Sequence, residues 1–266
     1  MIDTGDYQIE DEARVRDLVR THGWATLVSV ADDGAPVASH LPVLLEDTPP
    51  GEPMSLLSHV GRPDEVLHRL DSGRESLLIV QGPHGYVSPG WYDMTPAVPT
   101  WNYVAVHLHC TVELLGPDES YAILSDTVDR YESVMPDPVR LPQVEEYAHR
   151  IAKGAAGFRL RVTRWQGKAK LSQDKPRAVA ERVVAALGSD PHYAQPALAA
   201  EMRAELDRRP DNPTPGSSGG AAGSPDGAAG SSGGAAGSSG GAAGSSGGAA
   251  AGVAGGSAVP PAGGAA

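Results

Sequence analysis

Apolar and polar residues alternate along several short stretches of this chain, which is the pattern of half-buried β-strands. The first stretch runs from Trp24 to Val30 and ends at residues 32–34, Asp-Asp-Gly, a sequence typical of a hairpin turn. Residues 37–45 then predict the returning strand. Further strands are predicted over residues 54–58, 76–81, 102–115 and 157–165, the last with Phe158, Leu160 and Val162 on one face.

Helical spacing of apolar positions separates these strands at only a few points. Helices are predicted over residues 10–20, 63–70, 118–132, 143–152, 178–187 and 197–208. Residues 82–100 contain four prolines and three glycines and predict no regular element. Consecutive strands joined by tight turns indicate an antiparallel barrel, mainly β with peripheral helices, rather than a doubly wound parallel sheet. Glycine-rich motifs of the Rossmann or Walker type do not occur.

Composition divides the 266 residues into two parts. Residues 213–266 hold 19 of the 33 glycines, one charged residue and repeats of a Gly/Ala/Ser unit, so they are predicted to be a disordered low-complexity tail. The foldable domain is therefore predicted over residues 1–212. The chain has no apolar run long enough to span a membrane, no signal-peptide pattern and one cysteine, Cys110. From this we expect a cytoplasmic protein.

Charge is distributed unevenly around a formal net charge of −12. An acidic chain argues against general coating of nucleic acid or of anionic membranes. Residues 150–182, however, hold ten of the 21 basic residues against two acids, Asp174 and Glu181. This segment could face DNA, face the phosphate of a ligand, or pair with the acidic remainder of the chain. Its centre, residues 167–173, fits a small phosphate or the rim of a flavin site better than a duplex.

Large aromatic residues gather in residues 81–103, which hold two of the four tryptophans and three of the eight tyrosines. On a loop pinned by prolines, such rings either plug the barrel or form the wall of a site for a flat aromatic ligand. In the second case Gln81 and Asn102 are available as hydrogen-bonding amides.

Histidines offer two further candidate sites. His59 and Arg62 precede a predicted helix, whose free amides favour an anion, so they are either a phosphate-binding corner or ordinary surface residues. His107 and His109 share one strand face and could ligate a metal, but no third ligand is evident, and hydrogen-bonded histidines are expected instead. No serine-nucleophile motif is present.

Six sequence motifs follow one another along the chain. They are Ala25-Thr26-Leu27-Val28-Ser29, Ala38-Ser39-His40-Leu41-Pro42, Gln81-Gly82-Pro83-His84, Tyr86 with Ser88-Pro89 and Trp91-Tyr92, Val98-Pro99-Thr100-Trp101-Asn102-Tyr103 with Val106-His107, and Lys170-Leu171-Ser172-Gln173. Together they resemble the PaiB family of FMN-binding negative transcriptional regulators, over nearly all of residues 7–188. The resemblance implies a split β-barrel of the flavin-reductase and pyridoxamine-phosphate-oxidase type. It also implies a homodimer with FMN at the subunit interface.

The resemblance further implies which residues bind FMN, and it implies neither a metal nor a catalytic residue. The implied set is Ser39, His40 and Leu41 at the isoalloxazine ring, His59 and Arg62 at the phosphate, and Gln81, Thr100, Trp101, Asn102, Lys170, Ser172 and Gln173 closing the pocket, partly from the second subunit. The chain departs from the family pattern at Pro63, at Asp174 and in the opening segment Asp6-Tyr7-Gln8. Pro63 removes an amide from the phosphate corner, and Asp174 adds a negative charge.

Three functions therefore remain open. The first is an FMN-binding transcriptional regulator, and the second is a flavin-dependent oxidoreductase that uses the same pocket. The third is direct binding of DNA through residues 150–182, although no helix-turn-helix with a basic recognition helix is evident. Whether the protein is an enzyme is not decided by its sequence.

Overall fold

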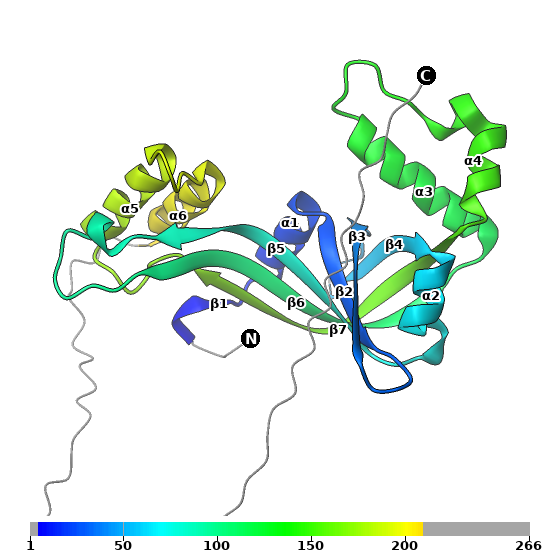
Figure 1. Ribbon diagram of the computed structural model, residues 1–266, viewed down its shortest axis with the longest axis horizontal. Helices are drawn as coiled ribbons and strands as arrows, with labels where there is room; N and C mark the ends of the chain where they lie inside the picture. Colours follow the sequence, from blue (N-terminus) through cyan, green and yellow to red (C-terminus); the bar gives the residue numbers. More distant parts are fainter. Residues whose placement is uncertain (1–4, 50, 210–266) are drawn as a thin grey trace, which may run out of the picture. The chain divides into compact units, whose positions relative to one another are not determined.

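Seven antiparallel strands form the frame of the protein in this computed structural model, which describes residues 5–49 and 51–209. Their order is β1-β7-β4-β3-β2-β5-β6, and β6 also pairs with β7, so strands β2 to β7 close into a barrel (Figure 1). The strands are β1 (Gln8–Ile9), β2 (Trp24–Val30), β3 (Pro36–Leu45), β4 (Ser55–Gly61), β5 (Ser76–Val87), β6 (Thr100–Leu114) and β7 (Ala155–Lys170). The predicted fold class, a mainly-β split barrel with peripheral helices, is confirmed.

The predicted helices are all present, each within about two residues of its predicted bounds. They are α1 (Glu12–Thr21), α2 (Arg62–His68), α3 (Pro117–Glu132), α4 (Glu145–Ala152), α5 (Arg177–Ser189) and α6 (Pro196–Arg208), with short 3₁₀ helices η1 (Gly5–Tyr7), η2 (Leu70–Ser72), η3 (Pro89–Trp91) and η4 (Leu141–Val144). Within the part of the chain that the structure describes, no helix is long and apolar enough to cross a membrane. The tail predicted over residues 213–266 lies outside the described residues.

The barrel interior is formed by the apolar positions of the alternating pattern. Phe158, Leu160 and Val162 on β7 are all buried, as their shared strand face predicts. Opposite strands add residues such as Leu27 and Leu108, which are completely buried. Helix α1 contributes Val15, Leu18 and Val19 to the same core. The intervening positions therefore lie on the outer face of the barrel.

One prediction about the strands is wrong. Residues 82–100 are not wholly irregular, because β5 continues to Val87 and pairs with the start of β6. The register between the two strands shifts between Gln81 and His84, so a bulge accommodates Gly82-Pro83 within the strand. As a result, β5, β6 and β7 are long enough to extend beyond the barrel toward α5 and α6 (Figure 1).

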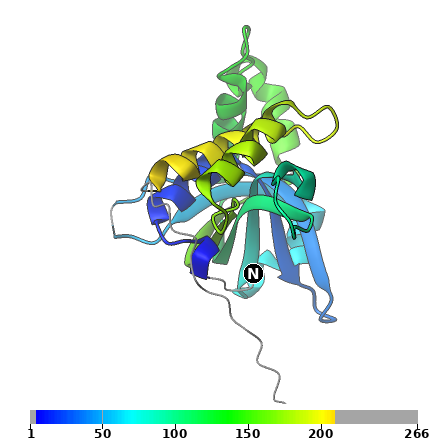
Figure 2. The same cartoon turned by 90° about the vertical axis from the view of Figure 1, so that its left-hand side faces the viewer.

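The helices pack on the strands where glycines allow a close approach. At the extended end of β5, a side-chain carbon on Gly85 would lie 2.9 Å from Gln195 and 3.1 Å from Leu198, so α6 rests directly on the strand. Helices α5 and α6 lie side by side there (Figure 2). Helix α3 packs on β7 in the same way, because a side-chain carbon on Gly157 would lie 2.7 Å from the Cα atom of Ser120.

Replacement of Gly157 by alanine is therefore expected to destabilise the fold by about 1–3 kcal/mol, since the added methyl group would force α3 away from β7. The measurement is the free energy of unfolding in urea. Gly188→Ala in α5 is the matched control, because its new methyl group would meet nothing within 4 Å. The control should be neutral or stabilising, and an equal loss in both variants would contradict the packing described.

Candidate functional site

A buried polar cluster lies at the extended end of β6 and β7 and contains several of the residues implied by the family resemblance. The Asn102 side chain is completely buried, and its Nδ2 donates to Ser172 Oγ at 2.9 Å and to Met202 Sδ at 3.4 Å. Its Oδ1 is also buried but has no hydrogen-bond partner among the described residues. A buried amide oxygen in this state is destabilising unless a ligand or water donates to it.

Lys170 is cross-strand partner to Tyr103 and so faces the opposite side of the sheet from Asn102. Its Nζ donates to the Thr100 hydroxyl, which joins the last residue of β7 to the first residue of β6. Burial lowers the pKa of Lys170, and the nearby charges of Lys168 and Lys175 lower it further, although Asp174 opposes them. A partly desolvated lysine among other lysines is a site where an anion would be stabilising.

The turn after β7 fixes Ser172 and Gln173. The Gln173 side chain accepts from the Leu171 amide at 2.6 Å and donates to the Ala169 carbonyl. Both hydrogen bonds join the side chain to the backbone just before it and so stabilise the turn. Ser172 then takes a left-handed conformation with φ of 64°, which aims its hydroxyl at Asn102. Gln173 therefore shapes the backbone, and its own hydrogen-bonding groups are already in use.

The negative charge of Asp174 is balanced locally. Its carboxylate forms an ion pair with Lys175 at 2.5 Å, and Lys175 Nζ lies 5.8 Å from the centre of the Tyr92 ring. Burial raises the pKa of Tyr7, and the charge of Asp174 together with a hydrogen bond to it raises that pKa further. The sequence did not predict that Tyr7, Tyr92 and Lys175 surround Asp174, because Tyr7 and Tyr92 lie far from Asp174 along the chain.

The aromatic segment is divided between the core and the surface. Tyr92 is buried in the hydrophobic core, whereas Trp101 is half exposed. The Trp101 indole stacks on His84 at 6.1 Å between ring centres, and Tyr86 bridges Trp101 to Tyr193. The buried Tyr92 fits the predicted plug, while the predicted wall for a flat ligand at Trp101 stays a prediction.

His40 and Gln81 lie on the outer face of the barrel. Thr26 on β2 pairs with His40 on the neighbouring strand β3 and with Ile79 on the other neighbour, β5. Its Oγ1 lies 3.0 Å from His40 Nδ1. The His40 ring also stacks on the exposed Trp24 at 6.4 Å. One row further along the same face, Gln81 is opposite Ala105, which in turn is opposite Lys168. Cross-strand partners share a face, so His40 and Gln81 face the same side as the lysines of β7.

The remaining members of the implied set lie elsewhere. Leu41 is buried in the core, and Ser39 Oγ lies 2.9 Å from His68 Nε2 beneath α2. His59 Nδ1 is buried without a hydrogen-bond partner among the described residues, and burial lowers the pKa of this histidine.

The Arg62 guanidinium pairs with Glu65 at 2.7 Å, and the Arg62 amide donates to the Gly154 carbonyl at 2.9 Å. Part of the Arg62 guanidinium and its backbone amide are thus already in use. This corner stays a prediction.

In the histidine pair on β6, His109 contacts a carboxylate. His109 Nδ1 lies 2.9 Å from Glu75 Oε1, which also pairs with Arg164 at 2.6 Å. Among residues 5–49 and 51–209, no group of three or more His, Cys, Asp or Glu residues could hold a metal ion.

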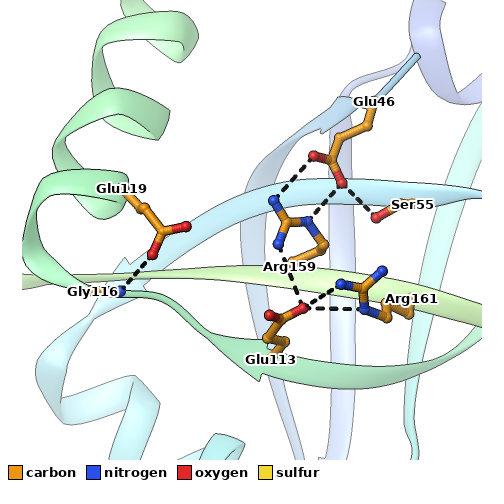
Figure 3. A network of polar contacts seen from close by, with 7 residues as sticks. All are labelled: Glu46, Ser55, Glu113, Gly116, Glu119, Arg159 and Arg161. Carbon is orange, nitrogen blue, oxygen red and sulfur yellow. Dashed lines mark hydrogen bonds and ion pairs between the residues drawn. The ribbon is translucent and has the colours of Figure 1, made fainter. Parts of the chain in front are cut away.

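The three arginines of β7, Arg159, Arg161 and Arg164, pair with acidic residues from other parts of the chain, and Figure 3 shows two of them, Arg159 and Arg161. Arg159 binds Glu46 at 2.9 Å and Glu113 at 3.4 Å, and Arg161 binds the same Glu113 at 2.7 Å. Ser55 Oγ donates to Glu46 at 2.5 Å, while Glu119 accepts from the Gly116 amide at the start of α3. Of the three partners considered for this segment, the acidic remainder of the chain is the one that occupies these arginines.

The Glu46 network should be visible as a pH dependence of stability. Burial alone would raise the pKa of Glu46, but hydrogen bonds from Arg159 and Ser55 and the charges of Arg159 and Arg161 outweigh it, so the pKa lies below 4.5. A carboxyl group whose pKa is lowered on folding stabilises the fold above its unfolded pKa and loses that contribution as the pH falls. The free energy of unfolding of the wild type should therefore decrease as the pH is lowered below 4.5.

Glu46→Gln should reduce this decrease, measured as urea unfolding at a series of pH values. The matched control is Glu146→Gln on α4, whose side chain is exposed. The control should keep the wild-type pH dependence. Identical pH profiles for wild type and Glu46→Gln would contradict the assignment.

Comparisons with known proteins agree with the sequence motifs. Residues 1–164 match the model of a family described as "Putative FMN-binding domain". The chain is 27% identical over 170 residues to Protease synthase and sporulation protein PAI 2 of Bacillus subtilis, an alignment that covers 64% of this chain and 80% of that protein. It is 30% identical over 122 residues to Uncharacterized protein YKL070W of Saccharomyces cerevisiae, covering 43% of this chain and 72% of that protein.

Solved structures resemble the chain only distantly. A FAD and heme binding protein from Mycobacterium smegmatis is 20% identical with a TM-score of 0.44, covering 62% of this chain and 73% of that one. The conserved hypothetical protein Rv2991 from Mycobacterium tuberculosis is 13% identical with a TM-score of 0.45. The match covers 64% of this chain and 91% of that one. Because both scores are low, the description of the fold rests on the strand pairing of this chain itself.

Proposed function

This chain belongs to the PaiB-type family of FMN-binding domains, and from that premise we propose that it is a homodimeric regulator of transcription with FMN at the subunit interface. One observation of this structure carries the cofactor site. Lys170 is partly desolvated at the end of β7, and the strand register places it on the same outer face as Lys168 and Gln81. Two cations and an amide on one face are complementary to a ligand with a phosphate and polar ring atoms.

The residues present fit FMN. The phosphate can accept from Lys170 and face Lys168 on the outer face of the barrel. A flat surface made of His40, Trp24 and Gln81 on the outer face of the barrel suits one side of an aromatic ring system. When bound, FMN would supply a ring that accepts and donates electrons.

The protein's own residues would hold the ligand and exclude water. Thr100 accepts from Lys170 and so keeps its ammonium group at the strand end, while Met202 of α6 covers Asn102 from above. Gln173 keeps the turn after β7 in the conformation that presents Ser172. Fixing these groups before the ligand arrives lowers the entropy lost on binding.

The outer face of the barrel supports the proposed dimer. Ile79, Leu77 and Ala105 on this face are apolar and only half buried in the single chain. A second copy that covers them would add apolar burial and bring site residues from two chains together. Light scattering coupled to gel filtration should give twice the mass of one chain, with flavin absorbance in the same peak. A single-chain mass without flavin absorbance would count against both parts of the proposal.

Regulation is proposed to be indirect. Arg159, Arg161 and Arg164 are engaged with Glu46, Glu113 and Glu75, so the three arginines of β7 are paired within the chain and offer less charge to a phosphate backbone. We expect no retardation of promoter DNA by the pure protein at low salt. Salt-sensitive retardation would instead support direct binding.

A second candidate function is flavin-dependent oxidation or reduction of a small molecule. The half-exposed rings of Trp101 and Tyr193, joined through Tyr86, could stack on a flat electron donor or acceptor. The test is oxidation of a reduced nicotinamide by the FMN-loaded protein. Turnover that is lost in Trp101→Ala would favour this candidate over a purely regulatory role.

A further inference from the structure

Four rings gather at the extended end of β5 and β6, and we call them the Trp101 cluster. Trp101 stacks on His84 with 6.1 Å between the ring centres and 24° between the ring planes. Tyr86, the cross-strand partner of Trp101, meets it edge-on at 6.3 Å and lies 4.9 Å from Tyr193 in the loop between α5 and α6. Trp101 and Tyr193 are each 50% exposed, so a large aromatic surface is open to solvent here.

The strand register places this cluster on the same face as the proposed FMN site. Asn102 contacts Met202 of α6, so its neighbour Trp101 lies on the opposite, outer side of the sheet. Tyr103 shares that outer side, and its cross-strand partners are His84 on β5 and Lys170 on β7. The aromatic rings and the lysine are therefore accessible from one direction.

Successive cross-strand rows of this face carry different chemistry. Outward from the barrel, His40 lies in one row, Lys168 in the next, Lys170 in the third and Trp101 in the fourth. Neighbouring rows are two residues apart along a strand, which is about 7 Å. The order is thus a surface for the flavin ring, then two cations, then exposed aromatic rings.

FMN accounts for only the first part of this order. With its ring beside His40 and its phosphate at the lysines, FMN ends before the row of Trp101. A flavin that continues beyond this phosphate carries a second phosphate and an adenosine, as in FAD. Adenine is a flat base, and bases of this kind stack on tryptophan and tyrosine rings.

The Trp101 cluster is held in place by hydrogen bonds of its own. Asp190 Oδ1 accepts from the backbone amides of His192 and Tyr193, both at 2.9 Å, and so fixes the loop that carries the tyrosine. Trp101 Nε1 donates to His84 Nδ1 at 3.4 Å. A surface fixed in this way loses little entropy when a ligand binds.

We infer that FAD binds the proposed FMN site with its adenine ring on the Trp101 cluster. The inference rests on the proposed flavin site and names its ligand more closely. The two phosphates of FAD would face Lys168 and Lys170, since one cation lies in each of the two rows before the cluster. FMN, the shorter ligand, binds the same lysines but leaves the rings of Trp101 and Tyr193 exposed.

Calorimetric titration with FAD and with FMN is the first arm of the test. The wild type should bind FAD at least about fivefold more tightly than FMN, because stacking of the base adds to the affinity. Trp101→Ala should weaken FAD binding about 5- to 100-fold and leave FMN binding within about twofold of the wild type. Trp101→Phe keeps a ring and should retain most of the preference for FAD.

Tyr147→Ala on α4 is the matched control, because Tyr147 is 55% exposed and lies outside the cluster. It should bind both flavins like the wild type. Equal affinity of the wild type for FAD and FMN would overturn the inference, as would an equal loss of both ligands in a folded Trp101→Ala variant. A wild type that binds neither flavin fails the proposed function itself, whereas one that binds both equally fails only this inference.

A second arm examines other occupants of the Trp101 cluster. Light scattering of Trp101→Ala should give the wild-type mass, and a smaller mass would make the cluster a contact between two copies and overturn the inference. NAD should not bind the FMN-loaded wild type, because FMN already occupies the lysines. Binding of NAD that is lost in Trp101→Ala would instead assign the cluster to a nicotinamide donor.

Discussion

Phe158→Ala is expected to lower the free energy of unfolding by about 3–5 kcal/mol, a large part of the stability of an ordinary domain. Phe158 is the only phenylalanine of the chain and is completely buried. It lies on β7, opposite Ser58 of β4 and Leu114 of β6, where the barrel closes. Removal of the ring would leave a cavity between these strands that neighbouring side chains could fill only in part.

Urea unfolding followed by circular dichroism measures this loss. The matched control is Val139→Ala in the loop after α3, where the valine is more than half exposed. We expect a change within about 0.5 kcal/mol for the control, as for other surface substitutions. Equal losses in the two variants would contradict the position of Phe158 in the core.

Lys170→Met is expected to weaken FMN binding about 10- to 100-fold while leaving the fold intact, since a hydrogen bond between charged groups contributes about 1.5–3 kcal/mol. Methionine keeps most of the length of the side chain but removes the ammonium group that Thr100 holds in place. Lys170 is partly buried among other positive charges, so its loss should relieve rather than create strain in the free protein.

The dissociation constant is measured by quenching of FMN fluorescence. Lys153→Met is the control, because Lys153 is exposed at the end of α4, and it should bind FMN like the wild type. The contribution of Lys170 should also shrink as the salt concentration rises. An unchanged dissociation constant in Lys170→Met would remove this lysine from the phosphate site.

Local sequence patterns were sufficient for much of the fold. The strand Trp24–Val30 and its turn are predicted because alternation and turn residues both act over a few neighbouring positions. The closure of β6 on β7 joins segments far apart in the chain, so no local pattern could predict their register. Residues 82–87 were misread because Gly82 and Pro83 usually end a strand, whereas here a bulge carries β5 past them.

The site was predicted through the family resemblance more than through residue chemistry. Asn102 contacts Ser172, and Lys170 contacts Thr100, although the two members of each pair are 70 positions apart in the sequence. The excess of positive charge in residues 150–182 was read correctly from the sequence, but the acidic partners of Arg159 could be recognised only after folding.

Binding of FMN is the central claim, and calorimetric titration of the purified protein tests it most directly. The account predicts saturable binding of one FMN per chain, with riboflavin, which lacks the phosphate, binding at least about tenfold more weakly because it cannot pair with the lysines of β7. Absence of binding by FMN, or equal affinity for FMN and riboflavin, would contradict the site described here.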